Sequence, residues 1–332
     1  MRSSDTPLLR LPPTVLVRHL HGHAETRQQH ARAAHRGDEI RVGRGAYVDR
    51  SEWDHLGARE RHLVRASAFG RTRATPPVFS HWSAAALHDL PFARDRADFI
   101  HIAVGRTSGG RSARDVRAHS VDVPQDDIVD VHGMRCTGLE RTVVDIAATS
   151  SRAEAVAVAD HVLAGADARD LVSGEARREA LLAAWMRAQP LRGHRRALEV
   201  IGFADGRAES PLESISRVAM HEAGLPRPLL QEPFDDRRGR IGYADFAWPE
   251  FGLIGEADGD AKYLDASLRG GRSAERVVLD EKIREDRLRA LGWTVVRWRW
   301  STAREAGALA RLLSDAGLPA DPRTRWDDCA VS

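Results

Sequence analysis

Residues 241–263 constrain the fold of this chain more than any other stretch. Two runs with strand character, residues 242–248 and 253–258, are separated by the short segment PEFG. A proline and a glycine at the two ends of so short a connection suit a tight turn between antiparallel strands. The stretch therefore predicts a β-hairpin.

The turn also sets the register of that hairpin. With PEFG as the loop, Trp248 faces Leu253 and Asp245 lies directly opposite Glu256, with Cβ atoms about 5 Å apart. Because side chains alternate along a strand, Asp258 falls on the same face as Glu256. A register shifted by one residue would instead divide these carboxylates between the two faces.

Carboxylates gathered this closely repel one another unless a proton or a cation intervenes. Mg²⁺ takes oxygen ligands and is often held by only one or two carboxylates together with water and substrate phosphate. We therefore expect Asp245 and Glu256 to bind Mg²⁺ or Mn²⁺, with Asp258 beside them. The alternative is that these side chains point to solvent and bind nothing.

Four segments in this part of the chain, YADFAWPE, GEADG, AKY and EKIREDRLRALGWTVVRW, belong together. They resemble the nuclease domain of the PD-(D/E)XK superfamily, in the branch similar to very-short-patch-repair endonucleases, over residues 209–313. The resemblance implies a sheet flanked by helices and metal-dependent hydrolysis of a phosphodiester. It also implies that Asp245 and Glu256 are the acidic residues of the motif.

The chain departs from that motif at one position, because Asp258 stands where the resemblance implies a lysine. Lys262, or Lys282 on a helix expected at residues 275–291, would then supply the missing cation. Two functions stay open as a result. One is a DNA endonuclease, in phage defence or DNA repair, and the other is a non-catalytic, antitoxin-like regulator that uses the nuclease fold only to bind DNA.

Further candidate residues flank the hairpin. Ser210 predicts a helix N-cap, with Glu213 at the third position, where its carboxylate can bond back to the cap. The resemblance implies instead that Glu213 is an additional metal ligand. A strand expected at residues 294–300 alternates between an aromatic face and a face carrying Arg297 and Arg299. These arginines and Lys282 are candidates for phosphate contact, and pairing with nearby carboxylates is the alternative for the arginines.

The N-terminal part has a different character. Residues 24–36 predict a basic helix, and residues 38–42 and 46–48 predict two strands around the turn GRG. A basic helix followed by a hairpin with arginine at its tip is the outline of a winged helix-turn-helix. In that geometry the helix lies in the major groove and the wing contacts phosphate or the minor groove.

The segments RVGRGAYVDR, SHWSAAALHDLPF and TGLERTVVDIA resemble AbiEi-type abortive-infection antitoxins and related regulators, over residues 22–148. The resemblance implies a DNA-binding winged helix with an α/β extension, and a cognate toxin as a possible partner. The candidates for contact with DNA are Arg27, Gln28, Arg32, Arg41 and Arg44.

Length and composition predict a multidomain α/β protein. The 332 residues exceed a single small domain, and a net charge of only +2 means that DNA contacts must rest on local patches. Two cysteines are too few for a disulfide framework. No apolar run approaches the about 20 residues that cross a bilayer. We therefore expect a cytoplasmic protein without a membrane partner.

Changes in character along the chain predict its domain organisation. The expected regions are a winged helix-turn-helix at 1–50, an α/β extension at 51–138, a helical region at 139–205, a nuclease-like domain with a restriction-endonuclease-like sheet at 206–315, and a tail at 316–332. Further helices are expected at 52–69, 142–148, 153–163, 175–188 and 194–203, and further strands at 99–104, 116–121 and 128–131.

Overall fold

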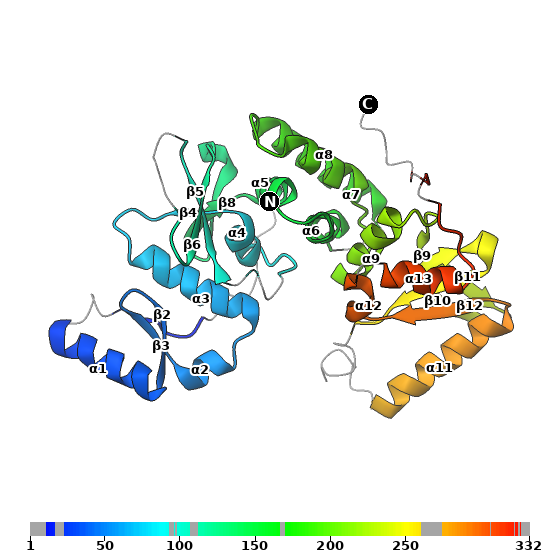
Figure 1. The fold of residues 1–332 in the computed structure, drawn as a ribbon, viewed down its shortest axis with the longest axis horizontal. Coiled ribbons are helices and arrows are strands. Elements are labelled where there is room, and N and C mark those ends of the chain that lie inside the picture. The colour runs from blue at the N-terminus through cyan, green and yellow to red at the C-terminus, as the bar shows by residue number, and fades with distance from the viewer. Residues whose placement is uncertain are drawn as a thin grey trace. The chain divides into compact units, whose positions relative to one another are not determined.

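The computed structural model describes residues 11–16, 23–92, 96, 98–106, 112–166, 170–259, 274–305, 307–321, 323, 324 and 326 (Figure 1). These residues form helices and three β-sheets, so the protein is of the α/β class that the sequence predicts. The chain divides into two compact units, residues 1–149 with 183–197 and residues 150–182 with 198–332. Residues of the helical region expected at 139–205 therefore contribute to both.

The first unit begins with a small sheet of order β1-β3-β2. Its elements are β1 (Val15–Leu16), α1 (His23–Arg36), β2 (Glu39–Gly43) and β3 (Ala46–Asp49). Helix α1 confirms the helix predicted at 24–36, and the β2–β3 hairpin confirms the strands predicted at 38–42 and 46–48. In the described residues, α1 is the one helix that precedes the hairpin, and β1 pairs with β3.

The prediction of a single helix over residues 52–69 is wrong, because the structure has two helices there. They are α2 (Arg50–Asp54) and α3 (Ala58–Arg71). Gly57 is the extended N-cap of α3, and its backbone N–H donates to Glu60 Oε2 over 2.6 Å. That local capping contact starts a new helix where the helix propensity of the flanking residues suggested continuity.

A five-stranded sheet of order β6-β5-β4-β8-β7 completes the first unit. The strands expected at 99–104, 116–121 and 128–131 are confirmed as β5 (Ile100–Val104), β6 (Val116–Ser120) and β7 (Ile128–Val131). Two short strands of this sheet, β4 (Val78–Phe79) and β8 (Met134–Thr137), were not predicted. Helix α4 (His81–Leu87) begins after the N-cap Ser80 and is buried along its whole length.

Helices expected in the middle of the chain are confirmed. They are α5 (Leu139–Thr149), α6 (Arg152–Ala164), α7 (Leu171–Arg187) and α8 (His194–Phe203). In the second unit, α6 packs against α9 (Pro211–Glu222). Part of the predicted tail packs in this unit as well, since Trp326 is buried and its indole N–H donates to the Leu225 carbonyl oxygen over 2.9 Å.

The second unit contains a four-stranded sheet of order β12-β11-β10-β9. Its strands are β9 (Leu229–Asp236), β10 (Gly239–Trp248), β11 (Leu253–Ala257) and β12 (Thr294–Trp298). Strands β9 to β11 run antiparallel, and β12 pairs with β11 in parallel. The β10–β11 connection is the 3-10 turn Pro249–Phe251, followed by Gly252 in a left-handed conformation (φ 58°) that favours glycine.

Helices cover both faces of this sheet, and Figure 1 shows α11 (Ala274–Ala290) on one side and α9 with α12 (Trp300–Arg304) and α13 (Ala308–Asp315) on the other. Leu288 of α11 and Ile254 of β11 belong to one hydrophobic cluster. On the opposite side, the Trp298 indole N–H donates to Ser216 Oγ of α9 over 2.8 Å. The sheet is thus buried on two faces, and polar groups within it need partners from the helices.

Candidate active site

The Asp245–Glu256 pair lies where the predicted hairpin places it. Strands β10 and β11 pair with Trp248 opposite Leu253, which confirms the register expected from the turn. Continuing that register brings Asp245 next to Glu256. The Ala257 backbone N–H donates to Asp245 Oδ2 over 2.8 Å, and this bond fixes the Asp245 carboxylate against β11.

Glu256 is a buried carboxylate with only 7% of its surface exposed. Burial, followed by the charge of the neighbouring Asp245, raises its pKa to about 7, although a hydrogen bond from Arg284 opposes both effects. A buried acid whose pKa is moved this far by desolvation and a like charge is typical of functional sites.

Arg284 of α11 is the cation that the structure brings to Glu256. Its Nη2 atom donates to Glu256 Oε1 over 2.9 Å and to the Tyr243 carbonyl oxygen over 2.6 Å. The side chain crosses β10 at Gly242, where a Cβ atom would lie 3.0 Å from Arg284 Nε. The glycine, with φ 148°, therefore leaves room for the guanidinium to reach the carboxylate.

The sequence interpretation did not identify Arg284. It assigned the missing cation to Lys262, which lies outside the described residues, or to Lys282, which is exposed on α11. No local pattern in the sequence points to this contact, because Arg284 meets Glu256 only once α11 packs on the sheet, where Leu288 and Ile254 belong to one cluster.

Asp258 follows the end of β11, and its carboxylate is paired. Arg297 of β12, which is opposite Glu256 in the parallel register, has Nη1 at 3.3 Å from Asp258 Oδ2. The same guanidinium lies 3.3 Å from Glu285 and 3.9 Å from Glu281, both on α11. Of the two roles open for Arg297, the structure has it pairing with carboxylates of the site.

Glu213 makes the capping contacts that its position predicts. Ser210 Oγ donates to Glu213 Oε1 over 2.7 Å, and the Glu209 backbone N–H donates to Glu213 Oε2 over 2.9 Å. Gln231 of β9 also donates to Oε2, over 3.2 Å. Burial raises the pKa of this carboxyl, and the hydrogen bonds act against that shift. Both Glu213 oxygens thus serve the start of α9.

Arg299 lies beyond the strand predicted to carry it, because β12 ends at Trp298 rather than at the expected residue 300. It is exposed and is the N-cap of α12. Within the part of the chain that the structure describes, no three His, Cys, Asp or Glu side chains are grouped so that they could hold a metal ion. The donors that the site offers are therefore the two carboxylates of Asp245 and Glu256.

The predicted DNA-contact residues of the first unit are all exposed. Three lie on α1 and two on the β2–β3 hairpin, in the order Arg27, Gln28, Arg32, Arg41 and Arg44. Arg41 Nε donates to the Gly43 carbonyl oxygen over 3.2 Å, which holds it along the hairpin. Four of the five side chains are arginines, and all of them are accessible to a ligand from solvent.

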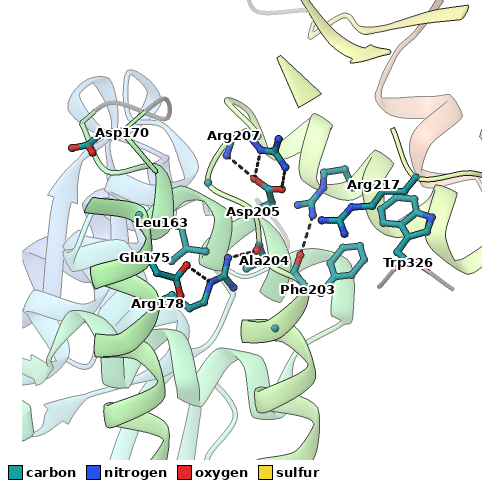
Figure 2. A pocket seen from close by; sticks show the side chains of 14 residues that line it. Leu163, Asp170, Glu175, Arg178, Phe203, Ala204, Asp205, Arg207, Arg217 and Trp326 are labelled. Carbon is teal, nitrogen blue, oxygen red and sulfur yellow. Dashed lines mark hydrogen bonds and ion pairs between the residues drawn. The ribbon is translucent and has the colours of Figure 1, made fainter. Parts of the chain in front are cut away.

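A pocket of about 390 Å³ lies elsewhere in the second unit, between α7, α8 and α9 (Figure 2). Arg207 donates to both oxygens of Asp205, over 3.0 and 2.7 Å. Although burial would raise the pKa of Asp205, these contacts with Arg207 hold it at about 2. Figure 2 shows this ion pair at the pocket wall, and the two charges largely neutralise each other.

Two further arginines of the pocket cap the C-terminal end of α8. Arg178 Nη2 donates to the Ala204 carbonyl oxygen over 2.8 Å, and Arg217 Nη2 donates to the Phe203 carbonyl oxygen over 2.9 Å. Carbonyl groups in the last turn of a helix lack partners within it. Arg178 and Arg217 therefore stabilise the end of α8.

Comparison with known proteins adds relatives without an assigned activity. No family model matches the chain. Two uncharacterised proteins of Mycobacterium tuberculosis, from strains CDC 1551 / Oshkosh and ATCC 25618 / H37Rv, are each 34% identical to it over 171 residues, which is 50% of this chain and 55% of theirs. The chain thus spans about half the length of the curated relatives it matches. No helix among the described residues is long and apolar enough to span a membrane.

Proposed function

We propose that this protein is a metal-dependent phosphodiester hydrolase that acts on DNA, with its active site at Asp245 and Glu256. The observation that carries the proposal is the buried Glu256 carboxylate beside Asp245, with a pKa raised to about 7 by burial and by that neighbour. The resemblance of residues 209–313 to PD-(D/E)XK nucleases supports the same assignment.

The donor set fits a hard divalent cation. Asp245 and Glu256 offer oxygen ligands, and the like charges of the pair favour a cation over two free carboxylates. Mg²⁺ is commonly held by one or two carboxylates, with water and substrate phosphate as the other ligands. When bound there, the ion would supply Lewis-acid polarisation of the phosphate and would lower the pKa of an attacking water.

The residues of the chain have distinct roles in this proposal. Asp245 is held in place by the Ala257 N–H, so its carboxylate is preorganised to bind the cation with Glu256. Arg297 keeps Asp258 paired. Arg299, exposed at the start of α12, and Lys282, exposed on α11, are in positions to contact backbone phosphate.

The first unit would bring the site to its target. We propose that the exposed basic residues of α1 and the β2–β3 hairpin bind DNA in the manner of a winged helix, with α1 in a groove and Arg44 of the turn on phosphate. Such contacts neutralise phosphate charge and make the affinity depend on salt.

Plasmid cleavage tests the proposal. Purified protein is incubated with supercoiled, linear and single-stranded DNA and with Mg²⁺ or Mn²⁺, beside Asp245→Asn and Glu256→Gln. Metal-dependent nicking that both variants lose supports the hydrolase. The proposal fails if the wild-type protein is folded and binds DNA but leaves every substrate intact.

That negative result would support a second function, a non-catalytic regulator similar to AbiEi-type antitoxins, with a cognate toxin as its partner. The observation that favours it is the replacement of the motif's lysine by Asp258, whose carboxylate pairs with Arg297. A regulator predicts salt-sensitive DNA binding that is equal in the wild-type protein and in Glu256→Gln, both with and without Mg²⁺.

A further inference from the structure

Arg284 and a divalent ion have the same partner in this site. The guanidinium contacts Glu256 Oε1 at 2.9 Å, and the Glu256 side chain is only 9% exposed. A buried carboxylate on a paired strand has little freedom to turn toward another cation. A metal ion that takes Glu256 Oε1 as a ligand must therefore occupy the place where Arg284 donates.

The charges of the site do not favour both cations at once. Asp245 and Glu256 carry two negative charges when ionised, and Arg284 offsets one of them. A divalent ion added while Arg284 stays would place a second cation on the Glu256 carboxylate, next to Arg297, which pairs with Asp258. Like charges held this closely repel one another, so release of Arg284 favours uptake of the metal ion.

Arg284 is also the partner that is able to move. Its side chain is 24% exposed, so a path to solvent exists, and besides Glu256 its contact on the sheet is the Tyr243 carbonyl oxygen, a neutral partner that water can replace. Its long, flexible stem can adopt another rotamer at modest cost. The Ala257 N–H, in contrast, keeps Asp245 in place on the sheet.

We propose that Arg284 is an internal counter-cation that a divalent metal ion displaces from Glu256, so that the charge at this helix position sets how tightly the site takes up metal. The proposal rests on the function proposed above and adds a regulatory feature to the same site. In the metal-free protein Arg284 neutralises the pair, and metal uptake is coupled to release of its side chain from β10 and β11.

Metal binding measured without DNA tests this proposal. Binding of Mn²⁺ is followed by the electron paramagnetic resonance signal of the free ion at pH 8.0, for the wild-type protein, Arg284→Gln and Glu256→Gln. Arg276→Gln is the matched control, because Arg276 lies on the same helix and pairs with the exposed Asp280. We expect Arg284→Gln to bind Mn²⁺ about tenfold or more tightly than the wild type, Arg276→Gln to equal the wild type, and Glu256→Gln to bind weakly.

Two results would overturn the proposal, and the second of them would also exclude the metal site. If wild-type binding depends on Glu256 but Arg284→Gln binds no more tightly, the displacement is wrong and the metal site stands. If neither protein shows Mn²⁺ binding that depends on Glu256, the proposed metal site fails as well. Circular dichroism checks the fold of each variant, and Arg284→Met, which keeps the apolar stem over Gly242, replaces Arg284→Gln if that variant does not fold.

Discussion

Asp160 of α6 and Arg217 of α9 form a buried ion pair, with Nη1 and Oδ2 2.8 Å apart and side-chain exposures of 1% and 3%. The pair joins a helix of the predicted middle region to the first helix of the nuclease-like domain, within one compact unit. The Asp205 backbone N–H also donates to Asp160, over 2.7 Å. Residues 150–182 are therefore part of the second unit rather than a separate linker.

Removal of one partner of this pair should destabilise the second unit strongly. Arg217→Met leaves the Asp160 carboxylate buried without its counter-charge, and burial already raises the pKa of Asp160 to about 6. We expect a loss of about 3–5 kcal/mol in the free energy of unfolding, measured by urea denaturation. The double variant Asp160→Asn with Arg217→Met should recover part of that loss. An equal loss in the single and in the double variant would contradict the explanation that the unpaired Asp160 charge causes the destabilisation.

Glu256→Gln should stabilise the protein, and more so at high pH. The folded pKa is about 7 and the ordinary value is 4.5, so between these values the folded carboxyl keeps a proton that the unfolded chain releases. Wild-type stability consequently falls as pH rises toward 7, and glutamine removes that dependence. The gain at pH 8 should be about 3 kcal/mol, and it should shrink toward pH 5.

Denaturation curves of Glu256→Gln and the wild type at pH 5 and pH 8 measure this difference. Glu250→Gln, in the exposed turn between β10 and β11, is the matched control and should show no comparable gain. A gain for Glu256→Gln that does not depend on pH would show that titration of Glu256 is not its origin.

The first unit should lose stability in mild acid. Burial, followed by the charge of His119, lowers the pKa of His101 to about 3, and burial, followed by the charge of Arg117, lowers that of His119 to about 4. An unfolded histidine takes up its proton near the ordinary value of 6.5, so below that pH the unfolded chain binds more protons. Each histidine therefore contributes a loss of about 1.4 kcal/mol per pH unit as pH falls below 6.5.

His119→Gln tests that explanation, since His119 Nε2 is 2.9 Å from His101 Nδ1 and glutamine retains a polar group there. The slope of unfolding free energy against pH, between pH 6.5 and 5, should decrease by about 1.4 kcal/mol per pH unit. The same substitution at the exposed His55 should leave the slope unchanged. An unaltered slope in His119→Gln would exclude this histidine as a cause of the acid sensitivity.

Charge reversal on α1 should weaken DNA binding. Arg27→Glu with Arg32→Glu removes two exposed positive charges from the proposed contact surface. We expect the affinity for a DNA duplex to fall about tenfold or more, and the slope of log K against log salt to decrease by about 1 for each lost phosphate contact. Fluorescence anisotropy at several NaCl concentrations measures both. Arg311→Glu, exposed in the second unit, is the control, and an equal effect there would indicate a nonspecific change in charge.

Local rules in the sequence determined the hairpin and the start of α9. The PEFG turn and the alternation of side chains gave the Trp248–Leu253 register, because both act within a few residues. Ser210 and Glu213 gave the capping contacts for the same reason. The α/β class followed from the order of such elements along the chain.

Tertiary structure decided which cation meets the carboxylates and where each charge is satisfied. Arg284 reaches Glu256 from α11, 28 residues further along the chain, because Leu288 packs in the same cluster as Ile254 and Gly242 leaves space. Arg297 faces Asp258 because β12 pairs in parallel with β11. These contacts depend on how a helix lies on a sheet and on the order of strands, and neither is encoded in the spacing of nearby residues.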